Sequence, residues 1–180
     1  QMATTANLGF PRIGADRELK KSLESYWAGK VSADELNTVA RTIRAANWKR
    51  QQAANITHIP SGDYTYYDHI LNHSFMFGVV PSRYDALKGK DPLTLYFAMA
   101  RGYQKDGVDV VACEMTKWFD TNYHYIVPEF DAVTSFTLNG NYLLDQFNEA
   151  KALGIHTRPV LVGPLTYLLL GKMRGEGDVL

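Results

Sequence analysis

The sequence has little of several features that would define its class. Its 180 residues include one cysteine, Cys113, so an internal disulfide is excluded and a reducing compartment such as the cytoplasm is expected. The 19 basic and 19 acidic residues cancel, which gives no overall reason to expect a nucleic acid or an anionic membrane as partner. The apolar patch at residues 167–170 is too short to span a bilayer. The first residues lack a basic segment followed by an apolar core, so a secretory signal is not expected.

The common nucleotide and nucleophile motifs are also missing. The sequence contains no G-x-G-x-x-G fingerprint, no P-loop and no G-x-S-x-G elbow. His69 and His73 have the i, i+4 spacing of a metal pair on a helix, but Ile70 stands where a zinc protease has its Glu, so packing is the favoured interpretation. Cys113 ends an apolar run and is expected to be a small buried side chain, not a ligand or nucleophile.

Apolar spacing predicts helices that alternate with strands. One helix is expected from Asp16, as N-cap, to Gly29, and a second from Ser32, with Glu35 completing a capping box. Further helices are expected at residues 66–77, 93–104 and 141–153, the last ended by Gly154. The predicted strands are residues 8–10, 57–59, 108–113, 134–138 and 157–161.

Strands that alternate with helices predict an α/β fold with a parallel sheet and helical crossovers. With 46% hydrophobic residues the chain can form one good core. A closed eight-stranded barrel usually needs about 250 residues, so this chain is too short to form one. The sheet is therefore expected to be open, or the chain to be a piece of something longer.

The run EMTKWFDTNYHYIVPEF, residues 114–130, combines Lys117 with acids, a histidine and several aromatic rings. It follows the predicted strand at residues 108–113, and α/β proteins bind ligands where loops leave the carboxyl ends of strands. A binding site fits this pattern. An aromatic loop that plugs one end of the fold, or faces another domain, fits it as well.

A second cluster is basic. Arg17, Lys20 and Lys21 share one face in the first turns of the first predicted helix, and Arg12 lies just upstream. Free backbone N–H groups and the helix dipole favour anions there, so a carboxylate or phosphate ligand is one interpretation. A solvated helix face paired with Glu18 and Glu24 is the other.

Four blocks together resemble one family. They are LGFPRIG with RELKKSLESYWAGK, IPSGDYTYYDHIL, EMTKWFDTNYHYIVPEF, and GIHTRPVLVGPLTYLLLGK. The chain resembles the cobalamin-independent methionine synthases over residues 8–172, and looks most like the fungal members. The resemblance implies a much longer protein with two face-to-face (β/α)8 barrels. Residues 1–180 would then be roughly the first half of the N-terminal TIM-type barrel, without the C-terminal zinc-binding barrel.

The resemblance also implies an activity. Such enzymes move the N5 methyl group of a methyltetrahydrofolate polyglutamate to the sulfur of homocysteine, with zinc and without cobalamin. The residues that match the family's folate-binding positions are Arg17, Glu18, Leu19, Lys20 and Lys117. The zinc ligands would lie in the C-terminal barrel, so neither a catalytic residue nor a metal ligand is expected here, and the segment alone should be inactive. The full-length protein is expected to be a cytoplasmic monomer.

Two rival functions remain at this stage. One is a stand-alone module that binds folate or another polyanion, although an unclosed half barrel would expose a long sheet edge. The other is a ligand-free scaffold whose aromatic run docks a second domain.

Overall fold

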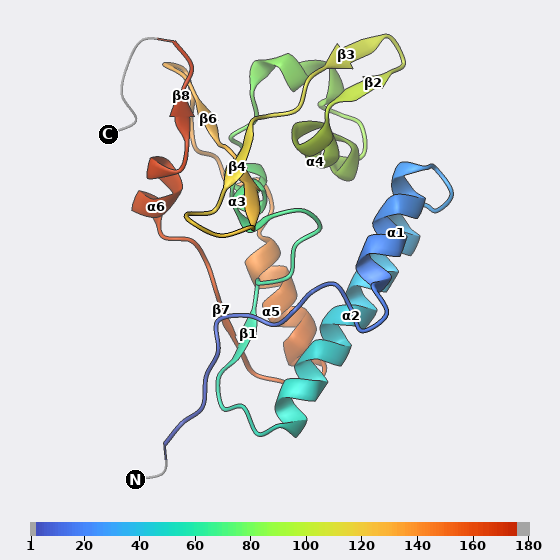
Figure 1. Cartoon of the computed structure of the whole chain (residues 1–180), viewed down its shortest axis with the longest axis vertical. Coiled ribbons are helices and arrows are strands. Elements are labelled where there is room, and N and C mark those ends of the chain that lie inside the picture. Colours follow the sequence, from blue (N-terminus) through green and yellow to red (C-terminus); the bar gives the residue numbers. More distant parts are fainter. Residues whose placement is uncertain (1–2, 176–180) are drawn as a thin grey trace. The chain divides into compact units, whose positions relative to one another are not determined.

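The chain folds into two units in the computed structural model, which describes residues 3–175 (Figure 1). Unit 1 joins the residues up to 66 to residues 142–161, and unit 2 joins residues 67–141 to those from 162 onward. Each unit is described by itself. None of the helices in the described range is both long and apolar enough to cross a membrane.

Unit 1 is built on parallel strand pairing. In its described part, Ala6 forms a parallel bridge with His58, and β1 pairs in parallel with β7, with Ile59 opposite Thr157. Helices connect or flank these segments, so the chain repeatedly crosses over and returns in the same direction. The elements of unit 1 are α1 (Glu18–Trp27), α2 (Ala33–Ala53), β1 (Ile59–Ser61), α5 (Tyr142–Ala152) and β7 (Thr157–Pro159).

The core of unit 1 fixes β1 between α2 and α5. Trp48 of α2 packs with Ile59 of β1, with Ala150 of α5 and with Ile155, which follows α5. Its indole Nε1 donates a hydrogen bond to the carbonyl oxygen of Pro60 at 3.1 Å. The pairing direction of β1 therefore depends on a buried side chain as well as on backbone hydrogen bonds.

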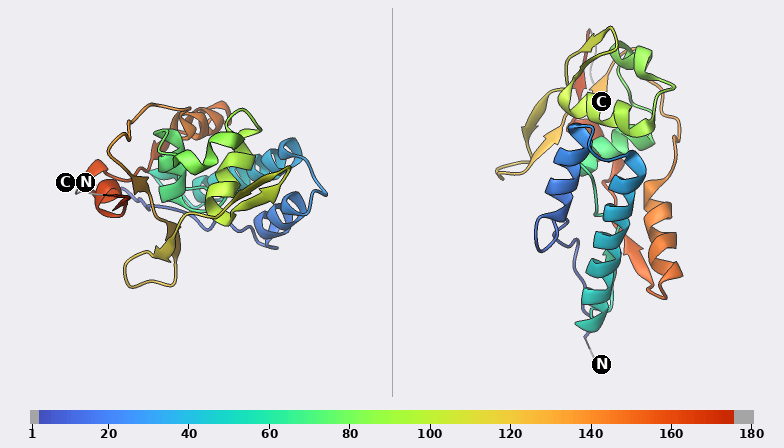
Figure 2. Two further views of the ribbon diagram at one scale, coloured as in Figure 1. Left: turned by 90° about the horizontal axis from the view of Figure 1, so that it is seen from above. Right: turned by 90° about the vertical axis from the view of Figure 1, so that its right-hand side faces the viewer.

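The described part of unit 2 contains two antiparallel hairpins and one parallel pair. The strand β2 pairs with β3 and β4 pairs with β5, both antiparallel, whereas β6 pairs in parallel with β8. Both views of Figure 2 show the hairpin of β4 and β5 extending from the rest of its unit. The elements of unit 2 within residues 67–175 are α3 (His69–Met76), η1 (Ser82–Leu87), α4 (Pro92–Arg101), β2 (Tyr103–Lys105), β3 (Val108–Val110), β4 (Met115–Lys117), β5 (His124–Ile126), β6 (Glu129–Phe130), α6 (Pro164–Leu169) and β8 (Lys172–Met173).

Two strand predictions were wrong, and a third was right only over Val108–Val110. Residues 8–10 are not a strand, and the parallel bridge forms earlier, at Ala6. Residues 108–113 are not a buried parallel strand: β3 is one arm of a hairpin, and Val111 after it is 69% exposed. Residues 134–138 form no strand, although Phe136 and Leu138 are apolar. Both side chains are exposed in the structure.

The hairpin of β2 and β3 has a local cause. Asp106 and Gly107 both have positive φ, 56° and 77°, which is the backbone of a two-residue hairpin turn. An Asp-Gly pair between short β-prone runs is a strong hairpin signal. The helix predicted at residues 93–104 extends into β2 and is wrong there. The helix α4 ends at Arg101, since Gly102 leaves the helical conformation with φ 79°.

The helix predictions held, with shifted ends. Ser32 caps α2, and the capping box with Glu35 is present as predicted. The helix predicted at residues 66–77 begins at His69, capped by Asp68. The predicted N-cap Asp16 was wrong: α1 begins after Arg17, whose side chain makes no capping hydrogen bond. The mixed α/β class with parallel pairs is thus confirmed, whereas the partial barrel stays a prediction.

Replacing Trp48 by Phe should weaken unit 1. The variant loses the hydrogen bond to Pro60 and part of the buried ring, which should cost about 1–2 kcal/mol. The measurement is the opening free energy of the β1 and β7 backbone amides by hydrogen exchange. Lys49→Ala, at the exposed neighbouring position, is the control. If both variants exchange alike, Trp48 does not hold β1.

Candidate functional site

The start of α1 carries four of the five predicted folate-binding residues. Arg17, the N-cap, lies in the left-handed region at φ 60°, which is uncommon for a residue other than glycine. The Glu18 carboxylate accepts a hydrogen bond from the Asp16 amide at 3.0 Å, so this acid orders the preceding turn. Leu19 is 2% exposed and anchors the helix in the core. Its amide donates to the Ile13 carbonyl at 3.1 Å.

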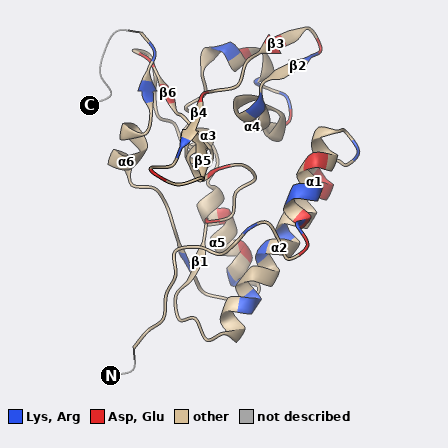
Figure 3. Ribbon diagram, viewed as in Figure 1, with Lys and Arg blue, Asp and Glu red and all other residues tan. Residues whose placement is uncertain are grey.

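The cations on α1 are exposed. Lys20 Nζ lies 3.8 Å from the Glu24 carboxylate, and both side chains are more than half exposed, so this pair is weak. Arg17 is exposed and has no ion pair within the part of the chain that the structure describes. Basic and acidic residues are mixed along the ribbon of α1 (Figure 3). The structure therefore agrees with both interpretations of this helix face, as an anion-binding site and as a solvated surface.

The other two predicted basic residues point elsewhere. Arg12 donates a hydrogen bond to the Thr65 hydroxyl, beyond the carboxyl end of β1. Lys21 lines a groove of about 620 Å³ between α1 and α2, together with Arg50. The sequence did not predict this groove, because helical spacing gives the faces of α1 and α2 but not the gap between them.

Lys117 lies in unit 2, at the end of β4. It is exposed and stands opposite His124 in the hairpin register. Within residues 3–175 it forms no ion pair. The structure therefore presents this ammonium group to solvent on a hydrogen-bonded hairpin, not on the irregular loop that the sequence predicted.

Some rings of the aromatic run pack inward, whereas Phe119 is 65% exposed. Tyr125 is buried in a cluster with Ile70 and Val127, and Trp118 packs against that cluster. The Trp118 ring also lies edge-on to the His69 ring, with centroids 4.6 Å apart. These rings pack the hairpin against α3, which agrees with the packing interpretation of the aromatic run. Lys117 is not part of this packing and stays exposed.

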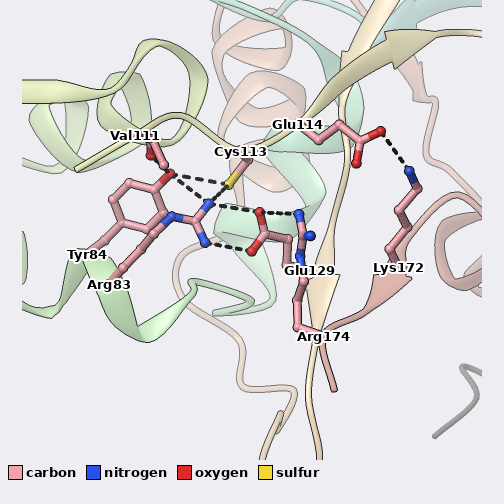
Figure 4. A network of polar contacts seen from close by, with 8 residues as sticks. All are labelled: Arg83, Tyr84, Val111, Cys113, Glu114, Glu129, Lys172 and Arg174. Carbon is pink, nitrogen blue, oxygen red and sulfur yellow. Dashed lines mark hydrogen bonds and ion pairs between the residues drawn. The ribbon is translucent and has the colours of Figure 1, made fainter. Parts of the chain in front are cut away.

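Two acids of the same run form ion pairs (Figure 4). Glu114 accepts from Lys172 Nζ at 2.7 Å on the surface. Glu129, whose side chain is 4% exposed, accepts two hydrogen bonds from Arg83, at 2.6 and 2.8 Å, and one from Arg174 at 3.3 Å. Burial would raise the pKa of Glu129, but the hydrogen bonds and charges of the two arginines hold it below its usual value.

The sequence did not predict this network. Arg83 lies 46 positions before Glu129 in the sequence, and Arg174 lies 45 positions after it. The parallel pairing of β6 with β8 brings Arg174 to Glu129. We call Arg83, Glu129 and Arg174 the arginine–glutamate network. It stabilises the part of unit 2 that follows the hairpin.

Cys113 belongs to the same surroundings. Its Sγ accepts a hydrogen bond from Arg83 Nη2 at 3.3 Å and lies 3.5 Å from the Tyr84 hydroxyl. Burial raises the pKa of the thiol to about 11, so it stays protonated at neutral pH. The prediction of a small buried side chain is confirmed.

His73 is part of the packing and not of an i, i+4 metal pair. Its Nδ1 lies 2.6 Å from the His69 carbonyl oxygen, and its Nε2 lies 3.1 Å from the Val162 amide. One neutral tautomer satisfies both contacts, and burial lowers the pKa of His73. Across residues 3–175, no group of three or more His, Cys, Asp or Glu side chains is arranged to hold a metal ion.

Comparison with known proteins gives one consistent family. The family described as "Cobalamin-independent synthase, N-terminal domain" matches residues 4–179. Three similar proteins are named 5-methyltetrahydropteroyltriglutamate–homocysteine methyltransferase. They come from Flavobacterium johnsoniae (57% identical over 96% of this chain and 22% of the relative), Xylella fastidiosa (54%, over 95% and 23%) and Saccharomyces cerevisiae (51%, over 95% and 23%). The chain thus spans less than a quarter of their length, and relatives from bacteria and a fungus are similarly close.

Replacing Glu129 by Gln should loosen the arginine–glutamate network. Arg83 would lose its charged partner, at a cost of about 2–3 kcal/mol, reduced because Arg83 is partly exposed. The readout is hydrogen exchange at the Lys172 and Arg174 amides, which bond to β6 and the residue before it. Because the folded-state pKa of Glu129 is lowered, the stabilisation is present at neutral pH and lost as the carboxylate is protonated in acid.

The matched control is Glu114→Gln, which removes the exposed pair with Lys172 and should cost less than about 1 kcal/mol. Equal effects of the two variants would show that the buried network adds nothing beyond a surface pair.

Proposed function

Because the chain belongs to the family of cobalamin-independent synthases, we propose that it is part of a methyltransferase. The full-length protein would move the N5 methyl group of methyltetrahydropteroyltriglutamate to the homocysteine thiolate and form methionine, without cobalamin. The observation that carries the proposal is the family match over residues 4–179, together with relatives of that printed name at 51–57% identity. The chain spans 22% of the first relative, so the activity belongs to the longer protein.

Within that protein, this segment is proposed to bind the substrate's glutamate tail. The tail is a string of carboxylates, and Arg17, Lys20 and Lys117 are exposed cations. Charged hydrogen bonds from such groups to carboxylates are stronger than neutral ones. The first turn of α1 adds backbone N–H groups and the positive end of the helix dipole.

The other two family positions would act indirectly. Glu18 cannot attract a carboxylate by charge, and its own carboxylate is engaged by the Asp16 amide. Leu19 is buried, so its side chain fixes the helix start rather than contacting solvent. Both residues would hold Arg17 and Lys20 in place.

The larger architecture is also a proposal. The parallel segments at Ala6, β1 and β7 suit the first strands of a (β/α)8 barrel, in which each strand is followed by a helix. The remainder of that barrel and a C-terminal zinc barrel would lie elsewhere in the full-length chain. We propose that this protein works as a cytoplasmic monomer, and that residues 1–180 alone are inactive.

The chemistry divides between the two parts. Without a proton, the N5 nitrogen of the folate would have to leave as an amide anion, which is a very poor leaving group. N5 must therefore be protonated, so that it leaves as a neutral secondary amine when the homocysteine thiolate takes the methyl group. The described residues of this segment do not fit a zinc site, since no three metal-binding side chains converge. No step through zinc is therefore assigned to them, and their part is to bind and orient the methyl donor.

Removing a proposed tail contact should weaken binding in the full-length protein. Lys20→Ala and Lys117→Ala should each lose about 1–3 kcal/mol of affinity for triglutamyl methyltetrahydrofolate, the size of a charged hydrogen bond. Calorimetric titration gives the dissociation constants. Lys105→Ala, an exposed lysine on β2, is the control and should bind as the unmodified protein does.

The number of glutamates sharpens the test. If the lysines bind the tail, their removal should matter less for the monoglutamyl form, which has fewer carboxylates. Unchanged dissociation constants for both lysine variants would contradict the ligand role.

A further inference from the structure

The hairpin that carries Lys117 is tied at its base to the start of α3. Asp68, the N-cap of α3, is fully buried. Its Oδ1 accepts a hydrogen bond from the Leu71 amide at 2.8 Å, and its Oδ2 accepts one from the Ile126 amide at 3.0 Å. Ile126 is the last residue of β5 and pairs with Met115, the first residue of β4. One carboxylate thus caps the helix and fixes the hairpin.

His69, the first residue of α3, contacts the hairpin nearer its tip. The His69 ring lies 4.6 Å from the Trp118 ring and is stacked on the Tyr123 ring at 5.7 Å. Its Nδ1 lies 3.4 Å from the Tyr123 hydroxyl. Trp118 follows Lys117 directly, and Tyr123 directly precedes His124, the residue opposite Lys117. The His69 contacts therefore lie on the tip side of Lys117, and the Asp68 hydrogen bond to Ile126 lies on its base side.

The tip between these rings is held in a restrained conformation. Phe119 has φ 49°, in the left-handed region that a bulky side chain rarely adopts. The Trp118 amide donates to the Tyr123 carbonyl at 2.7 Å, and the Thr121 amide donates to the Trp118 carbonyl at 3.1 Å. A strained residue persists where its surroundings determine the backbone.

We propose that Asp68 and His69 are positioning residues that hold Lys117 ready for an anionic ligand. Fixing the backbone on both sides of the lysine lowers the ordering cost of binding, because the main chain has already lost its freedom. The inference rests on the proposed function, since it needs Lys117 to contact the ligand. It adds that the affinity of this contact is set by two residues of α3 that need not touch the ligand.

Asp68→Asn separates the hydrogen bond that caps α3 from the hydrogen bond that holds the hairpin. Asn is as good an N-cap as Asp, so its single oxygen can keep the hydrogen bond to Leu71. Its NH₂ group would then face the Ile126 amide, donor against donor. The variant should keep α3 and release the hairpin. The matched control is Asp91→Asn, because Asp91 caps α4 through the Thr94 amide in the same way.

The test is a double-mutant cycle in the full-length protein with triglutamyl methyltetrahydrofolate as the probe. Asp68→Asn should raise the dissociation constant about threefold to tenfold, the range of one net hydrogen bond, and should speed hydrogen exchange at Ile126. The loss should vanish when Lys117 is already Ala, which a general loss of stability would not do. The Asp91→Asn control should bind normally.

Two results would overturn the inference in different ways. If Lys117→Ala weakens binding but Asp68→Asn does not, the positioning role is wrong and the proposed function stands. If Lys117→Ala binds normally, the ligand role of the lysine fails and the inference fails with it.

A folding failure of Asp68→Asn would not block the test. In the unmodified protein the Ile126 amide should then be as protected from exchange as the Leu71 amide, since one buried carboxylate holds both. Exchange of Ile126 as fast as that of exposed loop amides would overturn the inference.

Discussion

The parallel pairing of β1 with β7 is the constraint on which the arrangement of unit 1 depends. Parallel strands cannot be joined by a tight turn, so the chain must leave and return between them. The pairing continues past the strands, where the Val160 amide donates to the Ser61 carbonyl at 2.8 Å. Inside, the Thr157 hydroxyl donates to the Ser61 hydroxyl at 2.8 Å. The loops that follow β1 and β7 therefore leave from the same end of this strand pair.

That end is where the basic start of α1 is organised. Asp63, just past β1, accepts a hydrogen bond from the Phe10 amide at 2.9 Å, which ties the loop after the Ala6 bridge to the loop after β1. Burial raises the pKa of Asp63, and the hydrogen bond from Phe10 opposes that shift. The chain then reaches Arg17 and Lys20 through a turn ordered by Glu18. A cationic helix start is thus fixed by strand pairing and not by the helix alone.

Unit 2 presents its cation by a different means. Lys117 stands on an antiparallel hairpin, and the nearby rings of Trp118, Tyr123 and Tyr125 pack against residues of α3. The arginine–glutamate network secures the neighbouring β6 and β8, where a buried carboxylate needs charged partners to offset its desolvation. In unit 2, side-chain contacts position Lys117, whereas in unit 1 strand pairing positions the start of α1.

The sequence predicted well what depends on neighbours along the chain. The capping box of Ser32 and Glu35, the ends of α1 and α5 near Gly29 and Gly154, and the α/β class all follow from local spacing. It predicted poorly what depends on tertiary contacts. The run 108–113 was predicted as one buried strand, but only Val108–Val110 are a strand, and they form a hairpin arm because the Asp106–Gly107 turn folds them back on β2.

The same distinction holds for the candidate site. Arg17, Lys20 and Lys117 could be named from motif and charge, but their surroundings could not. The second role of Asp68 is one example, since its partner Ile126 lies 58 positions away. The pattern of residues 66–77 can predict that Asp68 caps a helix, but it does not show that Asp68 also holds a hairpin.

Methionine formation by the full-length protein tests the central claim most directly. The purified enzyme, with zinc and without cobalamin, is given homocysteine and methyltetrahydrofolate with either one or three glutamates. The account predicts that methionine forms and that the triglutamyl donor is used at lower concentration than the monoglutamyl donor. Absence of methionine would contradict the proposed function, and equal use of the two donors would contradict binding of the tail by this segment.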